Sequence, residues 1–213
     1  MKSIQSNIKK AKQYLDKNHC VAVPTETVYG LAGNAYSDVS VKKIFKLKKR
    51  PKYNPLILHY VSLNKLREDA ELNIPFIKLY KSLCPGPITF ILNKKKKSKI
   101  SKTANSRKKT IAIRFPKHKV ARSLLKIINF PLAAPSANIF SKLSPTSAWD
   151  VVDEFNGKVK IILDGGPCKI GLESTILDLT TRPTILRQGS ITKKKIEKIL
   201  KKKVFLKKKN YPD

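Results

Sequence analysis

The 213-residue chain is poor in acidic residues, and this shortage dominates its charge. It contains 14 Asp and Glu against 46 Lys and Arg, which gives a formal net charge of +32. A field of that size attracts polyanions such as nucleic acids and nucleotides. Arginine is also scarce, at seven of the 46 basic residues, whereas surfaces dedicated to nucleic acid rely on Arg for bidentate and stacked contacts. The lysine excess is therefore more typical of solvent-exposed lysines spread over the whole surface than of a dedicated RNA-binding surface.

The chain has only three cysteines, Cys20, Cys84 and Cys168, and no two of them have CxxC spacing. This number and spacing argue against a disulfide framework or a zinc site and favour a reducing compartment. The N-terminal segment lacks the apolar stretch of a signal peptide, and no apolar run approaches the length of a membrane span. We therefore expect a cytoplasmic protein that contacts no membrane.

The common catalytic motifs are missing as well. The sequence has no GxxxxGK[ST] phosphate loop, no GxGxxG fingerprint, no GxSxG elbow and no HExxH pair. The three histidines, His19, His59 and His118, do not have the spacing of metal ligands. No metal site is predicted, and an active site would have to be assembled from several separate strand ends.

Short apolar runs alternate with amphipathic segments along the chain, and this alternation predicts an α/β domain with a central sheet. The predicted strands are residues 20–23, 56–61, 88–92, 110–115, 132–134, 159–163, 175–179 and 184–187, and the predicted helices are residues 3–17, 38–48, 75–83, 117–129, 146–155 and 191–200. We assign residues 1–200 to one catalytic domain and residues 201–213 to a basic C-terminal tail. Residues 94–109 are polar and basic, which predicts a mobile surface loop that serves as a lid or as a solvated connector.

A first polar segment, PTETVYGL at residues 24–31, follows a strand that is predicted to be buried. Sheets of α/β proteins bind ligands just beyond strand ends. In an extended chain Thr25 and Thr27 point to one side, where two hydroxyls can bind a small polar ligand, and Glu26 points to the other. The alternative is a turn in which the Thr hydroxyls bond the local backbone.

A second segment places Lys48 in the last turn of a predicted helix and Arg50 directly before Pro51. Pro51 biases Arg50 away from helical geometry, so both cations can point at one anion. A compact ammonium beside a forked guanidinium suits phosphate. The alternative, cations that favour a helix C-terminus through its dipole, explains Lys48 but not Arg50.

Two further segments combine polar groups with small residues. In TIAIRFP, strand alternation puts Thr110, Ala112 and Arg114 on the face opposite to the Ile side chains, where Arg114 can bind a carboxylate in a bidentate manner. In APSAN, Ser136 and Asn138 share one face beside small alanines, which suits a tight polar pocket. The alternatives are an Arg stem packed along the sheet and a capped turn.

Taken in order, seven stretches resemble the threonylcarbamoyl-AMP synthase family, whose domain is called YrdC-like. They are PTETVYGLAGNA, FKLKKRPKYNPLILH, PGPITFIL, TIAIRFP, APSANIFSKLSPT, GLESTILDL and ILRQGSI. The resemblance implies a twisted mixed sheet with flanking helices around a large basic groove. It also implies an enzyme that joins L-threonine, bicarbonate and ATP into threonylcarbamoyl-AMP and releases pyrophosphate. Partner proteins would then transfer the threonylcarbamoyl group to the tRNA adenosine next to the anticodon.

The same resemblance implies two sets of site residues. Threonine would be held by Thr27, His59, Arg114, Ala134 and Ser174, with Arg114 on its carboxylate. ATP would be held by Lys48, Arg50, Asn54, Thr110, Ser136, Ser144 and Arg187. The family signature KxR and SxN corresponds to Lys48, Arg50, Ser136 and Asn138, the expected catalytic set, in which Lys48 and Asn138 serve phosphate handling and pocket shape. Mg²⁺ is expected on the phosphates, because charge neutralisation and positioning dominate such chemistry.

Two other interpretations remain open. One is a non-catalytic RNA-binding protein that uses the same basic groove, although the chain has no aromatic stacking set of the RRM or OB type. The other is a related carbamoyl-transfer domain with a different acceptor. Some family members carry a further C-terminal domain on a long linker that can cover the ATP site. We expect this chain to lack both, with residues 94–109 as a candidate substitute for the linker.

Overall fold

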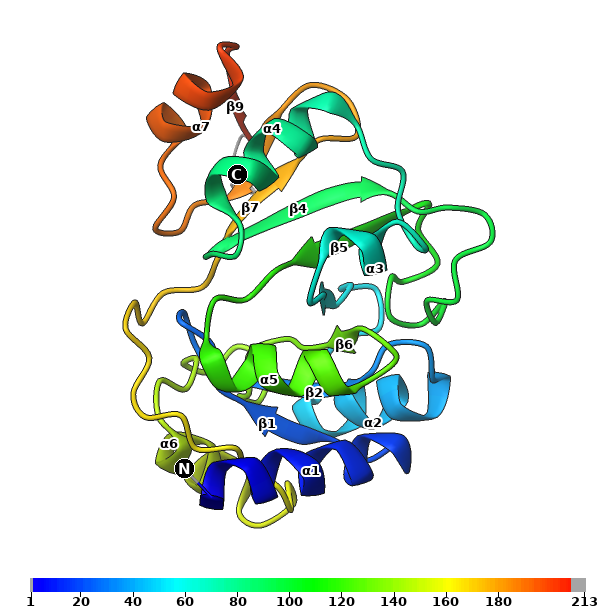
Figure 1. Cartoon of the computed structure of the whole chain (residues 1–213), viewed down its shortest axis with the longest axis vertical. Coiled ribbons are helices and arrows are strands. Elements are labelled where there is room, and N and C mark those ends of the chain that lie inside the picture. The colour runs from blue at the N-terminus through cyan, green and yellow to red at the C-terminus, as the bar shows by residue number, and fades with distance from the viewer. Residues whose placement is uncertain (1, 208–213) are drawn as a thin grey trace, which may run out of the picture.

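The computed structural model describes residues 2–207 (Figure 1). Part of the predicted tail, residues 208–213, lies outside the described residues. The described helices are α1 (Lys2–Asp16), α2 (Asp38–Lys48), α3 (Leu63–Leu66), α4 (Ile74–Leu83), α5 (Lys119–Ile127), α6 (Ala148–Phe155) and α7 (Lys193–Leu200). The described strands are β1 (Val21–Val23), β2 (Gly30–Asn34), β3 (Ile57–His59), β4 (Ile88–Asn93), β5 (Thr110–Arg114), β6 (Leu132–Ala133), β7 (Thr175–Asp178), β8 (Thr184–Arg187) and β9 (Phe205–Leu206).

All nine of these strands join one mixed sheet in the order β1-β2-β6-β3-β5-β4-β7-β8-β9. The pairs β3–β5, β4–β7 and β8–β9 are parallel, and the other neighbours are antiparallel. The prediction of an α/β domain built on a mixed sheet is therefore confirmed. In the described part of the chain, no helix combines the length and the apolar character needed to cross a membrane.

One face of the sheet is covered along most of its width. Alternate strand residues such as Leu58, Phe90 and Ile113 point to this face and join a single apolar cluster with side chains of α2, α4 and α7. Helices α4 and α7 lie together at the top of Figure 1. The apolar stripes that predicted these helices are thus the surfaces that they bury.

The opposite face is covered only in part. A second apolar cluster joins α1 and α5 to residues of β1, β2 and β6, such as Val21, Ala32 and Leu132, and these helices lie together at the bottom of Figure 1. Farther along the same face the strands β3, β5 and β4 carry His59, Arg114 and Thr89 in register with one another. These three belong to neither apolar cluster. The polar half of this face is where a ligand can reach the sheet.

Local capping signals set the ends of two helices. Ser37 caps the start of α2 by accepting a hydrogen bond from the amide of Ser40, and α2 ends where Lys49 adopts a left-handed conformation with φ 52°. That ending turns the chain so that Arg50 leaves the helix axis. Helix α6 begins with a reciprocal capping box between Ser147 and Asp150.

One strand was missed, and two predictions of local structure were wrong. Residues 30–34 form β2, although the sequence GLAGN has low strand propensity, because pairing with β1 and β6 overrides it. Residues 159–163 form a single bridge, Ala22 to Ile162, rather than a strand. The expected mobile loop at residues 94–109 packs against the body of the protein, with Ile100 and Ala104 buried and the amide of Ser101 donating to the carbonyl of Ala35.

Candidate functional site

Arg114 is the central cation of the polar half-face. Its side chain is buried, and its two terminal nitrogens donate hydrogen bonds of 2.8 Å to the hydroxyl of Thr27 and to the carboxylate of Glu26. The Nε atom of Arg114 is buried without a partner. A buried guanidinium with a donor to spare is able to bind a further acceptor, such as a carboxylate.

The loop between β1 and β2 holds Thr27 in this position. The hydroxyl of Thr25 accepts from the amides of Thr27 and Val28 and donates to the carbonyl of Val28, so it closes a local turn. The hydroxyls of Thr25 and Thr27 lie 2.8 Å apart. The two Thr side chains therefore point to one side as predicted, but Thr25 serves the turn and only Thr27 contacts Arg114.

His59 lies beside Arg114 at the end of β3. Its side chain is buried, and burial, aided by the neighbouring charge of Arg114, lowers the pKa of the imidazole to about 3. The ring is thus neutral at physiological pH, so one nitrogen accepts and the other donates. A neutral imidazole can orient a polar ligand without adding to the positive charge of Arg114.

Ser174, directly before β7, and Arg187, the last residue of β8, form the opposite side of the site. The Nε atom of Arg187 donates to the carbonyl of Ser174, and its terminal nitrogens donate to the Ser174 hydroxyl and to the carboxylate of Glu173. The hydroxyl of Ser174 is also 2.8 Å from that of Thr89 on β4. Burial lowers the pKa of Arg187, while Glu173 opposes that shift.

Lys48 joins the end of α2 to the segment after β6. Its ammonium group donates to the carbonyl oxygens of Ser136 and Asn138, and its own carbonyl accepts from the amide of Phe140. Burial, with the charge of Arg50, lowers the pKa of Lys48 to about 8. The amide group of Asn138 donates to the carbonyls of Ile139 and Lys142, which closes the same segment on itself.

Arg50 is held by backbone carbonyls. Its Nε donates to the carbonyl of Asn54 at 3.0 Å and a terminal nitrogen donates to that of Pro55 at 3.1 Å, while the guanidinium lies over the ring of Phe140. Burial lowers the pKa of Arg50, Glu173 opposes the shift and Arg187 adds to it. Arg50, Arg187 and Glu173 are therefore electrostatic neighbours.

These groups enclose one small cavity. It is lined by Thr25, Val28, Tyr29, Gly30, Ile57, His59, Arg114, Ala134, Ser136, Glu173, Ser174 and Arg187, and its volume is about 20 Å³. That space holds about one water molecule. The carboxylate of Glu173, which is paired with Arg187, forms part of the wall, so a larger ligand would have to displace side chains such as this one.

The sequence-predicted residues fall into three groups in space. His59, Arg114, Ala134, Ser136, Ser174 and Arg187 line the cavity. Thr27, Lys48, Arg50, Asn54 and Asn138 connect to it or to one another through the hydrogen bonds described above. Among the described residues, no hydrogen bond links the side chain of Thr110 or Ser144 to the other predicted residues. The binding roles of all these residues remain predictions.

Comparisons with known proteins identify the family of the chain. A model of the Sua5/YciO/YrdC family, described as "Telomere recombination", matches residues 13–189. The chain belongs to the Sua5/YciO/YrdC family. It is 41% identical over 201 residues to threonylcarbamoyl-AMP synthase of Pyrococcus abyssi, a match that covers 91% of this chain and 57% of that protein. It is 42% identical over 196 residues to threonylcarbamoyl-AMP synthase of Bacillus subtilis, covering 91% and 56% of the two chains.

A solved structure extends the likeness to three dimensions. The crystal structure of P. abyssi Sua5 complexed with L-threonine matches this Sua5/YciO/YrdC fold with a TM-score of 0.90 and 40% identity, over 94% of this chain and 58% of that one. The recognition of the family from the seven stretches is therefore confirmed. The chain spans little more than half the length of these relatives.

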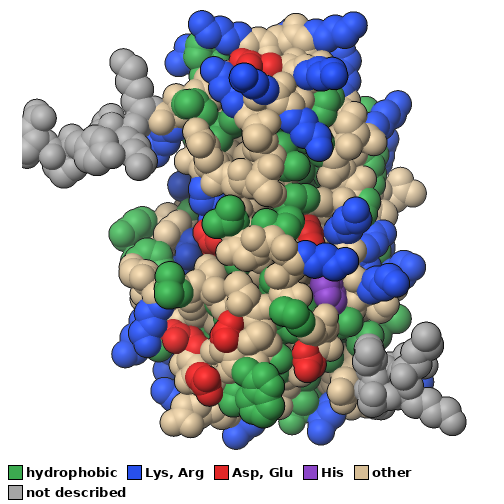
Figure 2. Space-filling view, turned by 90° about the vertical axis from the view of Figure 1, so that its left-hand side faces the viewer, with side chains coloured by type: hydrophobic (Ala, Val, Ile, Leu, Met, Phe, Trp, Pro, Cys, Tyr) green, Lys and Arg blue, Asp and Glu red, His purple; other side chains and the backbone are tan. Residues whose placement is uncertain are grey.

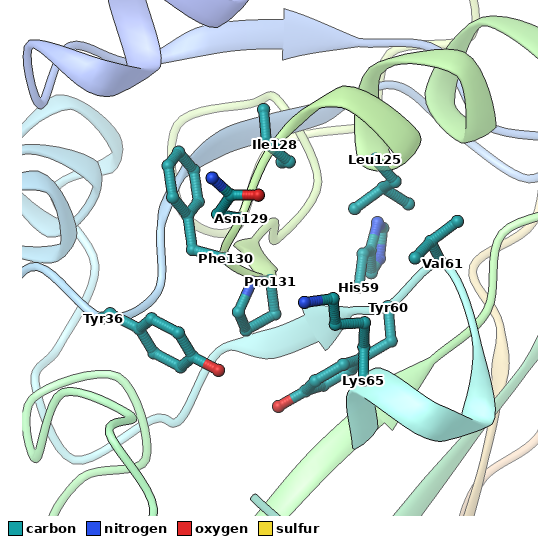
Figure 3. A pocket seen from close by; sticks show the side chains of 10 residues that line it. All are labelled: Tyr36, His59, Tyr60, Val61, Lys65, Leu125, Ile128, Asn129, Phe130 and Pro131. Atoms are coloured by element: carbon teal, nitrogen blue, oxygen red, sulfur yellow. The ribbon is translucent and has the colours of Figure 1, made fainter. Parts of the chain in front are cut away.

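A second cavity adjoins the site in this Sua5/YciO/YrdC chain. Figure 3 shows His59 beside Tyr60, Lys65 and Leu125 in its wall. The hydroxyls of Tyr36 and Tyr60, which also line it, both donate to the carboxylate of Asp69. The His59 ring thus stands between two cavities, each of which holds only a few tens of Å³ or less.

Sequence reasoning missed three residues of the site. Glu26, Glu173 and Thr89 all lie within the seven stretches, but no role was given to them. Glu26 was expected to point away from Thr27, yet the turn at Thr25 brings its carboxylate to the same guanidinium. The available signal for the two acids was their position directly before predicted threonine ligands, Thr27 and Ser174, in a chain whose buried cations need counter-charges.

Proposed function

We propose that this chain synthesises threonylcarbamoyl-AMP from L-threonine, bicarbonate and ATP, with release of pyrophosphate. The observation that carries the proposal is the buried guanidinium of Arg114, whose Nε lacks a partner beside Thr27 and His59. The relatives named threonylcarbamoyl-AMP synthase support it, as does the related structure solved with L-threonine.

In this proposal Arg114 binds the carboxylate of threonine. Thr27, His59, Ser174 and the backbone of Ala134 contact its other polar groups. The neutral state of His59 suits this task, because a neutral imidazole keeps one acceptor nitrogen for a hydrogen bond from the ligand, which a protonated ring lacks. Glu26 keeps Arg114 paired when no amino acid is bound. When threonine binds, Glu26 has to release at least one N–H donor of Arg114 to the ligand.

Arg50 and Arg187 bind the phosphates of ATP, with Ser136, Asn54, Thr110 and Ser144 around the rest of the nucleotide. Lys48 and Asn138 shape the segment that carries Ser136. The ammonium of Lys48 has two carbonyl partners, so it reaches a phosphate by giving up one of them. The buried cations supply the positive field that a triphosphate requires.

The chemistry needs no nucleophile from the protein. The amine of threonine attacks the carbon of bicarbonate, a C–N bond forms, and water leaves to give a carbamate. A carbamate oxygen then attacks the α-phosphorus of ATP, the bond to the β-phosphate oxygen breaks, and pyrophosphate departs. The enzyme contributes positioning, charge stabilisation and exclusion of water from a labile intermediate.

Mg²⁺ would enter with the phosphates, where it neutralises charge on the leaving pyrophosphate. Mg²⁺ is commonly bound by substrate phosphates plus one or two carboxylates. The described residues contain no group of three or more His, Cys, Asp or Glu side chains able to hold a metal. Glu173 is the single carboxylate that lines the cavity, so a phosphate-borne ion with few protein ligands fits this site.

The wider setting belongs to the proposal as well. Residues 1–200 form the catalytic domain and residues 201–213 a basic tail, of which the β9 segment pairs with β8. The protein works in the cytoplasm, and partner proteins carry the threonylcarbamoyl group to tRNA. The large basic groove also remains a prediction, because Lys and Arg side chains are scattered around the face in Figure 2 rather than gathered in one groove.

A pyrophosphate-release assay tests the function. The complete mixture should release pyrophosphate, and omission of either threonine or bicarbonate should abolish the release. Mass spectrometry of the mixture should detect threonylcarbamoyl-AMP. Pyrophosphate release that ignores threonine would refute the proposal. Salt-sensitive RNA binding without any turnover would instead favour the RNA-binding interpretation.

A further inference from the structure

A larger pocket lies outside the candidate site. It is formed by the end of α1, the start of β1, helix α2 and the segment after α6, and its volume is about 290 Å³. We call it the lysine pocket, and its lining consists of Tyr14, His19, Cys20, Lys43, Lys46, Leu47, Lys158 and Lys160. No residue lines both this pocket and the cavity beside Arg114.

The charge of the lysine pocket has one sign. Four ammonium groups line it, and no Asp or Glu does. Six ion pairs occur among the described residues, and none of them includes Lys43, Lys46, Lys158 or Lys160. Like charges that converge without a counter-ion repel one another, so an anion in the pocket would relieve this repulsion.

The backbone fixes the direction of these lysines. Lys43 and Lys46 are three residues apart on α2, which places them on one helix face. Lys158 and Lys160 flank Val159, which is buried, so both lysines are left on the solvent side. The amide of Ala22 donates to the carbonyl of Ile161, which anchors that segment to β1.

The apolar and aromatic part of the lining completes a binding site. The rings of Tyr14 and His19 lie 5.5 Å apart in a tilted arrangement, and the amide of His19 donates to the carbonyl of Tyr14. Lysine ammonium groups are compact point charges that suit phosphate oxygens. The volume is near the lower end of the range for small-molecule sites, enough for closely spaced phosphates with one adjoining group.

We propose that the lysine pocket binds a phosphate-bearing polyanion, with Lys43, Lys46, Lys158 and Lys160 contacting at least two adjacent phosphates. Two sources share this chemistry, the backbone of an RNA strand and a free oligophosphate. The site is independent of the proposed synthase reaction, because it uses none of the residues of the candidate site.

The test must separate a site from the general field of a +32 chain. One double variant, Lys43→Gln with Lys46→Gln, removes two pocket charges from α2. A second, Lys158→Gln with Lys160→Gln, removes two from the other wall. The matched control is Lys78→Gln with Lys81→Gln, because these lysines are exposed on α4 with the same three-residue spacing and the same loss of charge.

Binding is measured by fluorescence anisotropy with a labelled single-stranded RNA oligonucleotide and by calorimetry with inorganic triphosphate, across a range of salt concentrations. Each pocket variant should bind about tenfold more weakly. For the single-stranded RNA the slope of log K against log salt should also shrink by about 1.4, roughly 0.7 for each lost phosphate contact. The control should bind like the unmodified chain.

The arms of the experiment also identify the source. Loss of RNA binding alone assigns the pocket to a nucleic-acid backbone, and loss of triphosphate binding alone assigns it to a free oligophosphate. Loss of both supports the shared chemistry. Equal losses in the pocket variants and in the α4 control, or no loss in the pocket variants, would overturn the proposal. Circular dichroism verifies that all three variants are folded.

Discussion

The ammonium nitrogen of Lys48 lies 2.5 Å from the carbonyl oxygen of Ser136, a residue 88 positions away along the chain. A second bond from the same ammonium reaches the carbonyl of Asn138. The two halves of the KxR and SxN signature are thus tied together by the protein itself. Lys48 holds the backbone that carries Ser136, which makes it a positioning residue in the proposed reaction.

Lys48→Met should therefore damage both stability and ATP use. The substitution leaves one buried and one partly buried carbonyl without this donor, which should lower the free energy of unfolding by about 2 kcal/mol. It should also raise the ATP KM more than the threonine KM, because the displaced segment carries Ser136. Urea unfolding and steady-state pyrophosphate release measure the two effects.

The matched control is Lys42→Met, which removes an exposed lysine from the same helix. That variant should keep the parental stability and both KM values. A Lys48→Met enzyme with full stability and full ATP turnover would contradict the positioning role. Lys48 would then be explained simply as a cation favoured at the helix C-terminus.

Arg114→Ala should weaken the use of threonine by about 3 kcal/mol in kcat/KM, because a charged bidentate contact is lost. The single variant leaves Glu26 buried without its partner, and that alone can unfold the protein. The double variant Arg114→Ala with Glu26→Gln avoids an unpaired buried charge. Its threonine kcat/KM should still be low, whereas Glu26→Gln alone should retain activity.

Threonine titrations of pyrophosphate release measure these values, and thermal melts verify folding. If the double variant keeps the parental threonine KM and kcat, Arg114 does not bind the substrate and the central part of the proposed function fails.

Much of the fold and part of the site could be predicted from the sequence because the signals were local. The helix α2, its end before Pro51 and the strand TIAIRFP each follow from periodicity, capping and alternation. Thr25 and Thr27 do share one side, but a local turn closed by the Thr25 hydroxyl places them there rather than strand alternation. These features depend on residues within a few positions of one another.

What the sequence could not reveal depends on contacts between distant segments. The bond of Lys48 to Ser136 and the pairing of Glu26 with Arg114 join residues 88 positions apart. The strand GLAGN forms because β1 and β6 flank it, not because of its composition. The many lysines of residues 94–109 predict a solvated loop. The segment packs against the protein instead, because the two apolar side chains Ile100 and Ala104 are buried.

Glu173→Gln should improve the affinity for ATP. The carboxylate of Glu173 accepts a hydrogen bond from Arg187 and attracts the guanidinium of Arg50. It therefore neutralises part of the positive charge that binds the phosphates in the proposed function. Its removal should lower the ATP KM about threefold at low salt, with a smaller change at high salt because the side chain is partly exposed. The threonine KM should change little.

Initial rates at several salt concentrations check this prediction, with Glu68→Gln as a control that removes an exposed carboxylate far along the chain. A higher ATP KM in Glu173→Gln would show the opposite role, in which the carboxylate assists nucleotide binding, for example through the metal ion.

The buried imidazole of His59 should make the protein less stable in acid. Its pKa is about 3 in the folded state against 6.5 as the ordinary value, so between these values the unfolded chain binds a proton that the folded chain does not. The free energy of unfolding therefore falls as the pH drops through this window, and the contribution of His59 is complete only above its ordinary pKa. Between pH 7.5 and pH 5 the loss from this residue should be about 2 kcal/mol.

Urea unfolding at both pH values measures this loss. The free energy of unfolding of His59→Asn should fall by about 2 kcal/mol less than that of the parent over the same pH range. His19→Asn is the control for the removal of a histidine from the surface. A His59→Asn variant with the same pH dependence as the parent would mean that the folded protein protonates His59 readily, and the neutral ring assigned to the threonine site would have to be abandoned.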